Sequence, residues 1–157
     1  MKTEIGWILV RARGESIISL ELVDTKAPEP PRAVAARLEA YFAGDLAALD
    51  ALEVEPEGTD FQRRVWAELR RIRPGETISY GELARRIGRP RAVRACGRAN
   101  ATNPIALVIP CHRVIGADGS LTGYAGGIER KKWLLEHERR YTALPAAQPV
   151  LQAAWKL

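Results

Sequence analysis

Two helix-start signals, with the prolines and glycines around them, divide the middle of the chain into short helices. Thr59–Gln62 and Ser79–Glu82 each fit a capping box, in which two side chains satisfy free backbone N–H groups at a helix start. Pro74-Gly75 predicts the end of the first helix and Gly88 the end of the second. A third helix is predicted over Pro90–Asn100, because proline suits a first helical turn. The second and third helices form a helix-turn-helix candidate.

The first third of the chain mixes strand and helix patterns. Ile5–Val10 and Ile17–Val23 are apolar or β-branched runs around a polar turn, which predicts a hairpin. Arg32–Phe42 has apolar residues at helical spacing, so we expect a helix there. A stiff proline-rich linker and a further short helical turn are expected at residues 24–31 and 45–52.

A change in charge accompanies the expected break between domains at Glu53–Gly58, an acidic segment with a proline and a glycine. Residues 1–58 hold six Lys+Arg against eleven Asp+Glu, whereas residues 59–157 hold eighteen against eight. From the hairpin and helix before this break and the helices after it, we expect an α+β protein. It would have a small N-terminal α/β domain (1–58) and a mainly helical C-terminal domain (59–157), whose tail at 141–157 has no assigned role. The strongly basic second part is typical of a surface that meets a polyanion.

The third predicted helix carries the arginines that best fit nucleic acid. Arg91, Arg94 and Arg98 recur at i, i+3 and i+7, which places them on one helical face, while Val93 and Cys96 fall on another. The other residues of this helix are small, so its backbone could approach a groove closely. A solvated arginine face on an ordinary alanine-rich helix is the alternative interpretation.

A candidate nucleophile follows the apolar run Ile105–Ile109, which predicts a buried strand or extended segment. The run leads into Pro110-Cys111-His112-Arg113-Val114. A thiol beside His and Arg is in an electropositive setting that lowers a thiol pKa, and a nearby His is the usual base for a thiol nucleophile. A Cys-His dipeptide alone is weak support, because adjacent side chains usually point apart and either could belong to the core.

Two further segments could complete such a site. Leu121–Gly127 is glycine-rich, and a loop of this kind can approach a ligand closely. The last helix is predicted over Ile128–Arg140, with Glu138 beside Leu134 and Leu135 on one face. An acid on an apolar face needs a partner, and a carboxylate that orients His112 would follow the logic of a catalytic triad. Glu138 could equally be solvated near the end of the helix.

The cysteine and histidine content excludes several protein classes. With Cys96 and Cys111 as its only cysteines and two histidines, the chain lacks a disulfide scaffold and any zinc-binding spacing, so we expect no metal. Neither a signal peptide nor a membrane-spanning run is present, which leads us to expect a cytoplasmic location and no membrane partner. Cys96, on the apolar face of its helix, is interpreted as packing.

Taken together, these motifs resemble the O6-alkylguanine-DNA alkyltransferases, also called methylated-DNA–protein-cysteine methyltransferases, in their bacterial stand-alone form. The resemblance rests on Pro110–Val114, with the upstream Ser79–Ala84 and Arg91–Asn103 segments and the downstream Tyr124–Gly127 loop. It covers about Thr59–Glu138 strongly and residues 1–58 loosely, as the smaller RNase H-like N-terminal domain of that family.

The resemblance implies DNA repair by direct reversal of damage. Such a protein binds duplex DNA that contains O6-alkylguanine, and O4-alkylthymine as a further substrate. It flips the damaged base out through the minor groove. The alkyl (methyl) group then moves irreversibly to Cys111, once per molecule. The protein is itself the acceptor, so no cofactor is needed, and a monomer is expected.

The resemblance also assigns catalytic roles residue by residue. Cys111 would accept the alkyl group, His112 would activate it through a bridging water, and Glu138 would orient His112. Asn103 would brace the turn of the active site. Tyr80 would rotate the target phosphate and assist departure of the guanine, since a phenol can supply a proton.

Other positions would bind the DNA or the base. Arg94 matches the arginine finger that fills the gap in the base stack. The backbone carbonyls of Cys111 and Val114 would meet the guanine amine, and Tyr124 and Ala125 would line the pocket. The remaining expected DNA or substrate contacts are Arg91, Gly97, Arg98 and Gly126.

Two other functions are weighed against this interpretation. Alkyltransferase-like proteins bind alkylated DNA without repairing it, but they lack the cysteine that this chain has as Cys111. A Cys-His hydrolase would need an oxyanion hole, and it would leave the arginine-bearing helix pair unexplained.

Overall fold

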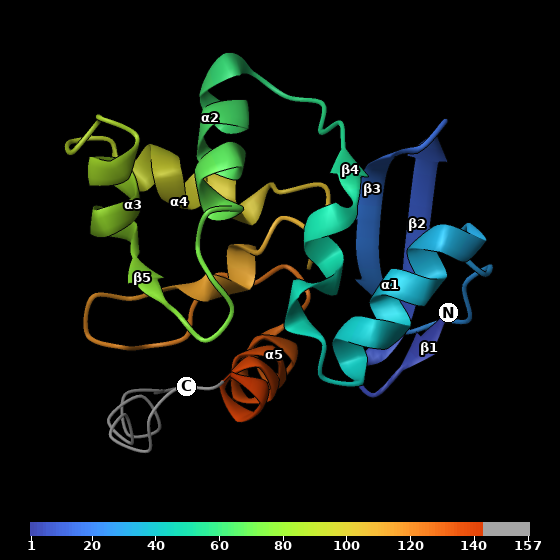
Figure 1. Cartoon of the computed structure of the whole chain (residues 1–157). Coiled ribbons are helices and arrows are strands. Elements are labelled where there is room, and N and C mark those ends of the chain that lie inside the picture. The colour runs from blue at the N-terminus through green and yellow to red at the C-terminus, as the bar shows by residue number, and fades with distance from the viewer. Residues whose placement is uncertain (143–157) are drawn as a thin grey trace.

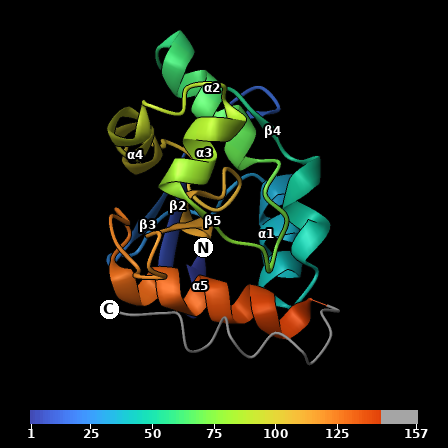
Figure 2. The ribbon, with the colours of Figure 1, turned by 90° about the vertical axis from the view of Figure 1, so that its left-hand side faces the viewer.

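The computed structural model describes residues 1–142, and the chain has mixed α+β structure (Figure 1). A small sheet and the helix at residues 32–42 lie on one side, and the short helices between residues 60 and 101 lie on the other (Figure 1). The last helix runs below both parts (Figure 2). None of the helices between residues 1 and 142 has the length and apolar character needed to span a bilayer.

The N-terminal sheet has the strand order β1-β2-β3-β4. The predicted hairpin is confirmed as β2 (Gly6–Arg13) and β3 (Ser16–Val23), joined through Gly14, whose φ of 61° suits a tight turn. Two strands were not expected: β1 (Lys2–Thr3) pairs antiparallel with β2, and β4 (Glu53–Val54) pairs parallel with β3. Each has two residues, too few to carry a periodic pattern.

One helix packs on this sheet. Helix α1 (Arg32–Phe42) has the predicted bounds, and its apolar face buries Val34, Leu38 and Tyr41. The short turn that follows it is the 3-10 helix η1 (Leu46–Ala51). The linker before α1 is irregular, as predicted.

The first helix of the second part begins at the predicted cap. Helix α2 (Asp60–Leu69) has a full capping box between Thr59 and Gln62. Its buried face consists of Val65, Trp66 and Leu69. The Trp66 indole donates to the Ala99 carbonyl at 2.8 Å, which ties α2 to a later helix.

The second cap is only half formed. After β5 (Ile78–Ser79), helix α3 (Tyr80–Arg86) begins with the Ser79 hydroxyl accepting from the Glu82 N–H. The Glu82 carboxylate instead accepts from the guanidinium groups of Arg85 and Arg86. The positive φ of 75° at Gly88 fits the predicted helix end.

The third predicted helix starts later than expected. Helix α4 spans Val93–Ala101, so the prediction of a start at Pro90 is wrong. Arg91 lies in the turn before the helix, and only Arg94 and Arg98 of the predicted row belong to α4. Val93 is 39% exposed and does not share the buried face of Cys96. Proline fits a turn as well as the first turn of a helix, so the sequence pattern does not distinguish the two structures.

The expectation of an extended segment at Ile105–Ile109 is also wrong. The segment is buried but folds into consecutive turns: the Ile109 N–H donates to the Ile105 carbonyl, and Leu107 has a φ of 69°. A run of apolar residues records burial, and it does not distinguish a strand from a compact turn.

The last three elements within residues 1–142 are η2 (Cys111–Arg113), the two-residue strand β6 (Val114–Ile115) and helix α5 (Ile128–Tyr141). Strand β6 pairs parallel with β5. Buried residues from both sides of Gly58 form one continuous core that includes Ile8, Leu38 and Leu83. Most of the expected tail at 141–157 lies outside the described residues.

Candidate active site

Cys111 begins the short 3-10 helix η2, directly after the buried turns of residues 105–109. Its side chain is 7% exposed. Burial raises the pKa of the Cys111 thiol, and a hydrogen bond with Asn103 and the charge of Lys131 only partly offset this. The expectation that neighbouring His and Arg lower this pKa is therefore wrong, because those side chains face a different partner.

Two asparagines hold the chain around Cys111. The Asn103 amide donates to the Ile109 carbonyl at 2.8 Å, and its carbonyl oxygen accepts from the Ile105 N–H at 2.9 Å. One side chain thus bridges the two ends of the buried turns. Asn100, at the end of α4, donates to the Cys111 carbonyl at 3.3 Å. Asn103 was among the expected site residues, and Asn100 was not.

The partner of His112 is Glu138. The two atoms His112 Nε2 and Glu138 Oε2 lie 2.9 Å apart, and both side chains are 1% exposed. Arg113 also binds this carboxylate, with Nε on one oxygen and a terminal nitrogen on the other. Burial alone would raise the pKa of Glu138, but His112 and Arg113 together hold the pKa well below its usual range.

An ionised Glu138 fixes the protonation of His112. A carboxylate only accepts hydrogen bonds, so His112 Nε2 carries the hydrogen. Burial lowers the pKa of His112, although Glu138 acts in the opposite direction, and the imidazole is neutral at rest. Its Nδ1 is buried and has no hydrogen-bond partner among the described residues. A neutral imidazole with a free ring nitrogen can accept a proton.

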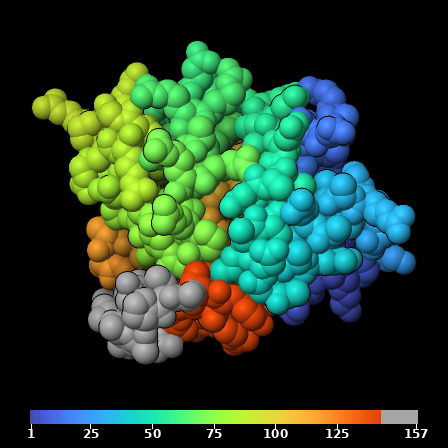
Figure 3. Space-filling model, viewed as in Figure 1, coloured from blue at the N-terminus to red at the C-terminus, as the bar shows by residue number. Residues whose placement is uncertain are grey.

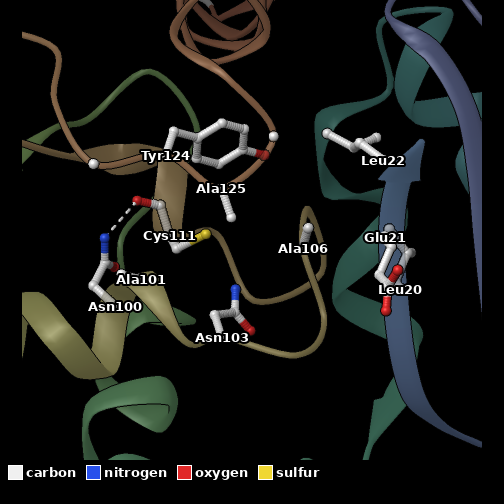
Figure 4. Close-up of a pocket in the computed structure, with 12 residues that line it drawn as sticks. Leu20, Glu21, Leu22, Asn100, Ala101, Asn103, Ala106, Cys111, Tyr124 and Ala125 are labelled. Atoms are coloured by element: carbon white, nitrogen blue, oxygen red, sulfur yellow. Dashed lines mark hydrogen bonds between the residues drawn. The ribbon is translucent and has the colours of Figure 1, made fainter. Parts of the chain in front are cut away.

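A cavity of about 220 Å³ opens at Cys111 (Figure 4). The sulfur of Cys111 points into it, with Tyr124 and Ala125 on one side and Asn103 on the other (Figure 4). Gly126 lines it as well, so every expected pocket residue of the glycine-rich loop is present. The remaining lining residues were not expected: Leu20, Glu21, Leu22, Asn100, Ala101, Ala106 and Gly123.

The N-terminal strand β3 forms the far wall of this cavity (Figure 4). Its Leu20 N–H donates to the Pro104 carbonyl at 2.9 Å, and its carbonyl accepts from the Ala106 N–H at 3.0 Å. Leu22 packs against Gly126, where an added Cβ would lie 3.3 Å from a Leu22 methyl. The sequence pattern marks these leucines as core residues of a hairpin and gives no signal of a pocket.

Tyr80 and Lys131 meet at the rim of the site. The Tyr80 hydroxyl donates to the Thr122 carbonyl at 3.3 Å. The Lys131 ammonium, which sequence reasoning missed, donates to the same carbonyl at 2.9 Å and to the Val114 carbonyl at 2.6 Å. Burial lowers the pKa of Lys131 to about 8. Gly97 of α4 lies beside the Tyr80 ring, where an added Cβ would be in ordinary contact at 3.8 Å.

The expected DNA contacts lie outside the cavity. Arg91, Arg94 and Arg98 are exposed, the first in the turn before α4 and the others on the helix. The expected carbonyl of Val114 accepts from the Lys131 ammonium. That of Cys111 accepts from both the Asn100 amide and the Val114 N–H, which use its two lone pairs within the protein.

Comparison with known proteins gives close relatives. Residues 60–140 match the family described as "6-O-methylguanine DNA methyltransferase, DNA binding domain". The methylated-DNA–protein-cysteine methyltransferase of Salmonella typhimurium is 49% identical over 138 residues, which cover 85% of this chain and 81% of that protein. The protein of the same name from Mycolicibacterium paratuberculosis is 50% identical over 148 residues, covering 88% of this chain and 89% of that protein.

A solved structure agrees with these relatives. Mycobacterium tuberculosis OGT, determined in complex with DNA, matches with a TM-score of 0.81 and 44% identity, covering 93% of each chain. The similarity therefore extends over the sheet and α1 as well as the helices around Cys111. The chain belongs to the family of methylated-DNA–protein-cysteine methyltransferases.

Proposed function

We propose that this protein repairs DNA by moving the alkyl group of O6-alkylguanine onto the sulfur of Cys111. The observation that carries the proposal is a buried thiol facing a cavity, next in sequence to a neutral imidazole that a carboxylate holds from behind. The relatives, named for alkyl transfer to cysteine, support the same chemistry.

The reaction begins with removal of the thiol proton. His112 Nδ1, which has no partner among residues 1–142, accepts the proton through a bridging water. The positive charge that forms on His112 is stabilised by Glu138, which already accepts from Nε2 at 2.9 Å. The raised pKa of the Cys111 thiol means that a thiolate needs this base and is not present beforehand.

The thiolate then attacks the alkyl carbon. A sulfur–carbon bond forms while the bond from that carbon to O6 breaks, and the electron pair leaves with the guanine. The departing anion takes a proton from the Tyr80 hydroxyl, which stands within 3.5 Å of a Cβ added at Gly123 on the cavity rim. The thioether on Cys111 is stable, so each molecule reacts once.

Duplex DNA is bound by the second part of the chain. Helices α3 and α4, joined through residues 87–92, act as a helix-turn-helix with α4 in the minor groove. Arg94 fills the space of the flipped base, and Arg91 and Arg98 contact phosphates. We propose that a monomer is the active form.

The first part of the chain supports the site and shares one continuous core with the second part. We propose that residues 1–58, with their sheet and α1, form the RNase H-like N-terminal domain, and residues 59–157 the domain that binds DNA and accepts the alkyl group.

The test is an intact mass after incubation with a duplex that contains one O6-methylguanine. We expect a gain of one methyl group, saturating at one per molecule and located on Cys111. Cys111→Ala should bind the duplex without gaining mass. Cys96→Ala, which changes the other thiol, is the matched control and should react like the natural chain. Repeated turnover, or tight binding with no adduct on the natural chain, would overturn the proposal.

A further inference from the structure

Helix α5 contacts both the backbone carbonyl and the side-chain hydroxyl of Tyr41, which lies on the N-terminal helix α1. His137 Nε2 lies 2.8 Å from the Tyr41 carbonyl oxygen, and the Tyr41 hydroxyl donates to Glu138 Oε2 at 2.7 Å. Tyr41 is fully buried. The space-filling view shows the α1–η1 segment and α5 in direct contact at the surface (Figure 3). Two consecutive residues of α5 thus fix the backbone and the hydroxyl of one tyrosine.

The hydroxyl reaches the same oxygen that His112 uses. Glu138 Oε2 accepts from Tyr41, from His112 Nε2 and from a terminal nitrogen of Arg113, whereas Oε1 accepts from Arg113 Nε. Burial raises the pKa of Tyr41 well above its usual range, and Glu138 raises it further, so the phenol stays protonated and remains a donor.

Tyr41 therefore competes with His112 for the charge on one carboxylate oxygen. Each donor that shares this charge weakens the pull of Oε2 on the His112 hydrogen. The phenol also fixes where Oε2 lies, and with it the plane of the imidazole. A hydroxyl from the N-terminal part of the chain thus acts on the imidazole that is next in sequence to Cys111.

We propose that Tyr41 is a positioning residue for alkyl transfer, through which the N-terminal domain sets the orientation and basicity of His112. This inference rests on the proposed function of Cys111 and His112. It gives the acidic N-terminal half a role in the chemistry that its charge and sequence pattern do not indicate.

Several elements packed around His112 carry charged or hydrogen-bonding groups that influence its pKa. Glu138 and Lys131 face it from α5, Arg113 is its neighbour on η2, and Tyr41 faces the same carboxylate from α1. Tyr80, Tyr124 and Cys111 are further titratable groups of the site. In a Tyr41→Phe variant only the phenol donor changes, because the ring contacts with Phe42 and His137 can remain.

The experiment measures the single-turnover rate of methyl transfer against pH for the natural chain, Tyr41→Phe and Tyr141→Phe. Tyr141 is an exposed tyrosine that also packs on His137, so it is a matched control. We expect the acid limb of the Tyr41→Phe profile to move to higher pH by on the order of one unit, the effect of losing one hydrogen bond to a carboxylate. Tyr141→Phe should keep the natural profile.

A second readout does not depend on transfer. The chain has two histidines, so the imidazole signals can be assigned with a His112→Asn variant and titrated by NMR. The pKa of His112 should rise in Tyr41→Phe and fall when 3-fluorotyrosine, a stronger donor, is placed at position 41. The second variant retains the hydroxyl and tests the idea even if Tyr41→Phe fails to fold.

The outcomes are distinguishable. An unchanged His112 pKa in both Tyr41 variants, or a rate lowered by one factor at every pH, would overturn the positioning role. If the natural chain gains no methyl group, the proposed function fails, whatever the titration of His112 shows.

Discussion

The ammonium of Lys131 lies 2.6 Å from the carbonyl oxygen of Val114, three residues after the candidate nucleophile Cys111. A second hydrogen bond, to Thr122, ties the same ammonium to the glycine-rich loop. Lys131 is fully buried. A buried cation is costly unless it is bound by oxygens, and here it joins the two segments that enclose the cavity.

Replacing Lys131 with methionine should make Cys111 less reactive. Burial lowers the pKa of Lys131 to about 8, so it is charged at pH 7, and this charge favours the Cys111 thiolate. We expect methyl transfer at pH 7 to slow by about tenfold, corresponding to about one pKa unit. Above pH 8 the natural chain loses the charge too, and the difference should shrink. Lys132→Met, next to it in α5, is the control; equal slowing in both variants would contradict the prediction.

Glu138→Gln should lower stability in a manner that depends on pH. The pKa of the Glu138 carboxyl is held well below its ordinary value of 4.5, so its stabilising effect is present above that pH and lost as the pH falls. Removing one partner of a buried charge pair costs about 3–5 kcal/mol. Urea unfolding at pH 7 should show a difference of that size between the natural chain and the variant. A gap that stays constant from pH 7 to pH 3.5 would contradict the prediction, because it would show that the pKa of Glu138 is the same in the folded and unfolded protein.

Leu22 should influence which alkyl groups react. Its side chain stands on β3 across the cavity from Tyr124 and Ala125 (Figure 4). We expect Leu22→Ala to raise the rate with O6-benzylguanine relative to O6-methylguanine severalfold, because the larger group gains room, and Leu22→Trp to do the reverse. Competition between the two duplexes measures the ratio. Leu9→Ala, on the neighbouring strand, should leave this rate ratio unchanged. An equal change in the ratio for Leu9→Ala would contradict a role for Leu22 in selecting the alkyl group.

Gly97→Ala should raise stability and lower DNA affinity. An added Cβ would meet only the Tyr80 ring at 3.8 Å, and alanine is favoured over glycine within a helix by about 1 kcal/mol. A methyl group on the face of α4 that we propose to lie in the groove should nevertheless weaken binding to an undamaged duplex severalfold. Thermal unfolding and a binding titration check the two effects. Unchanged affinity would place another face of α4 on the DNA.

Helix positions were largely predictable because their signals are local. The cap of Thr59 and the spacing of Val34, Leu38 and Tyr41 placed α2 and α1 correctly. The start of α4 was misplaced because proline fits both a turn and a helix start. The short strands β1, β4, β5 and β6 depend on partners elsewhere in the chain, and two residues carry no pattern of their own.

The sequence by itself determined which functional groups the protein has: one thiol beside an imidazole, a carboxylate on an apolar helical face and a basic helix pair. Only the tertiary structure decided how those groups act. Folding turned His112 and Arg113 toward Glu138, so burial dominates the pKa of the Cys111 thiol. It also brought Tyr41 and strand β3 of the acidic N-terminal half to the site. Such contacts join residues nearly a hundred positions apart, and no local pattern records them.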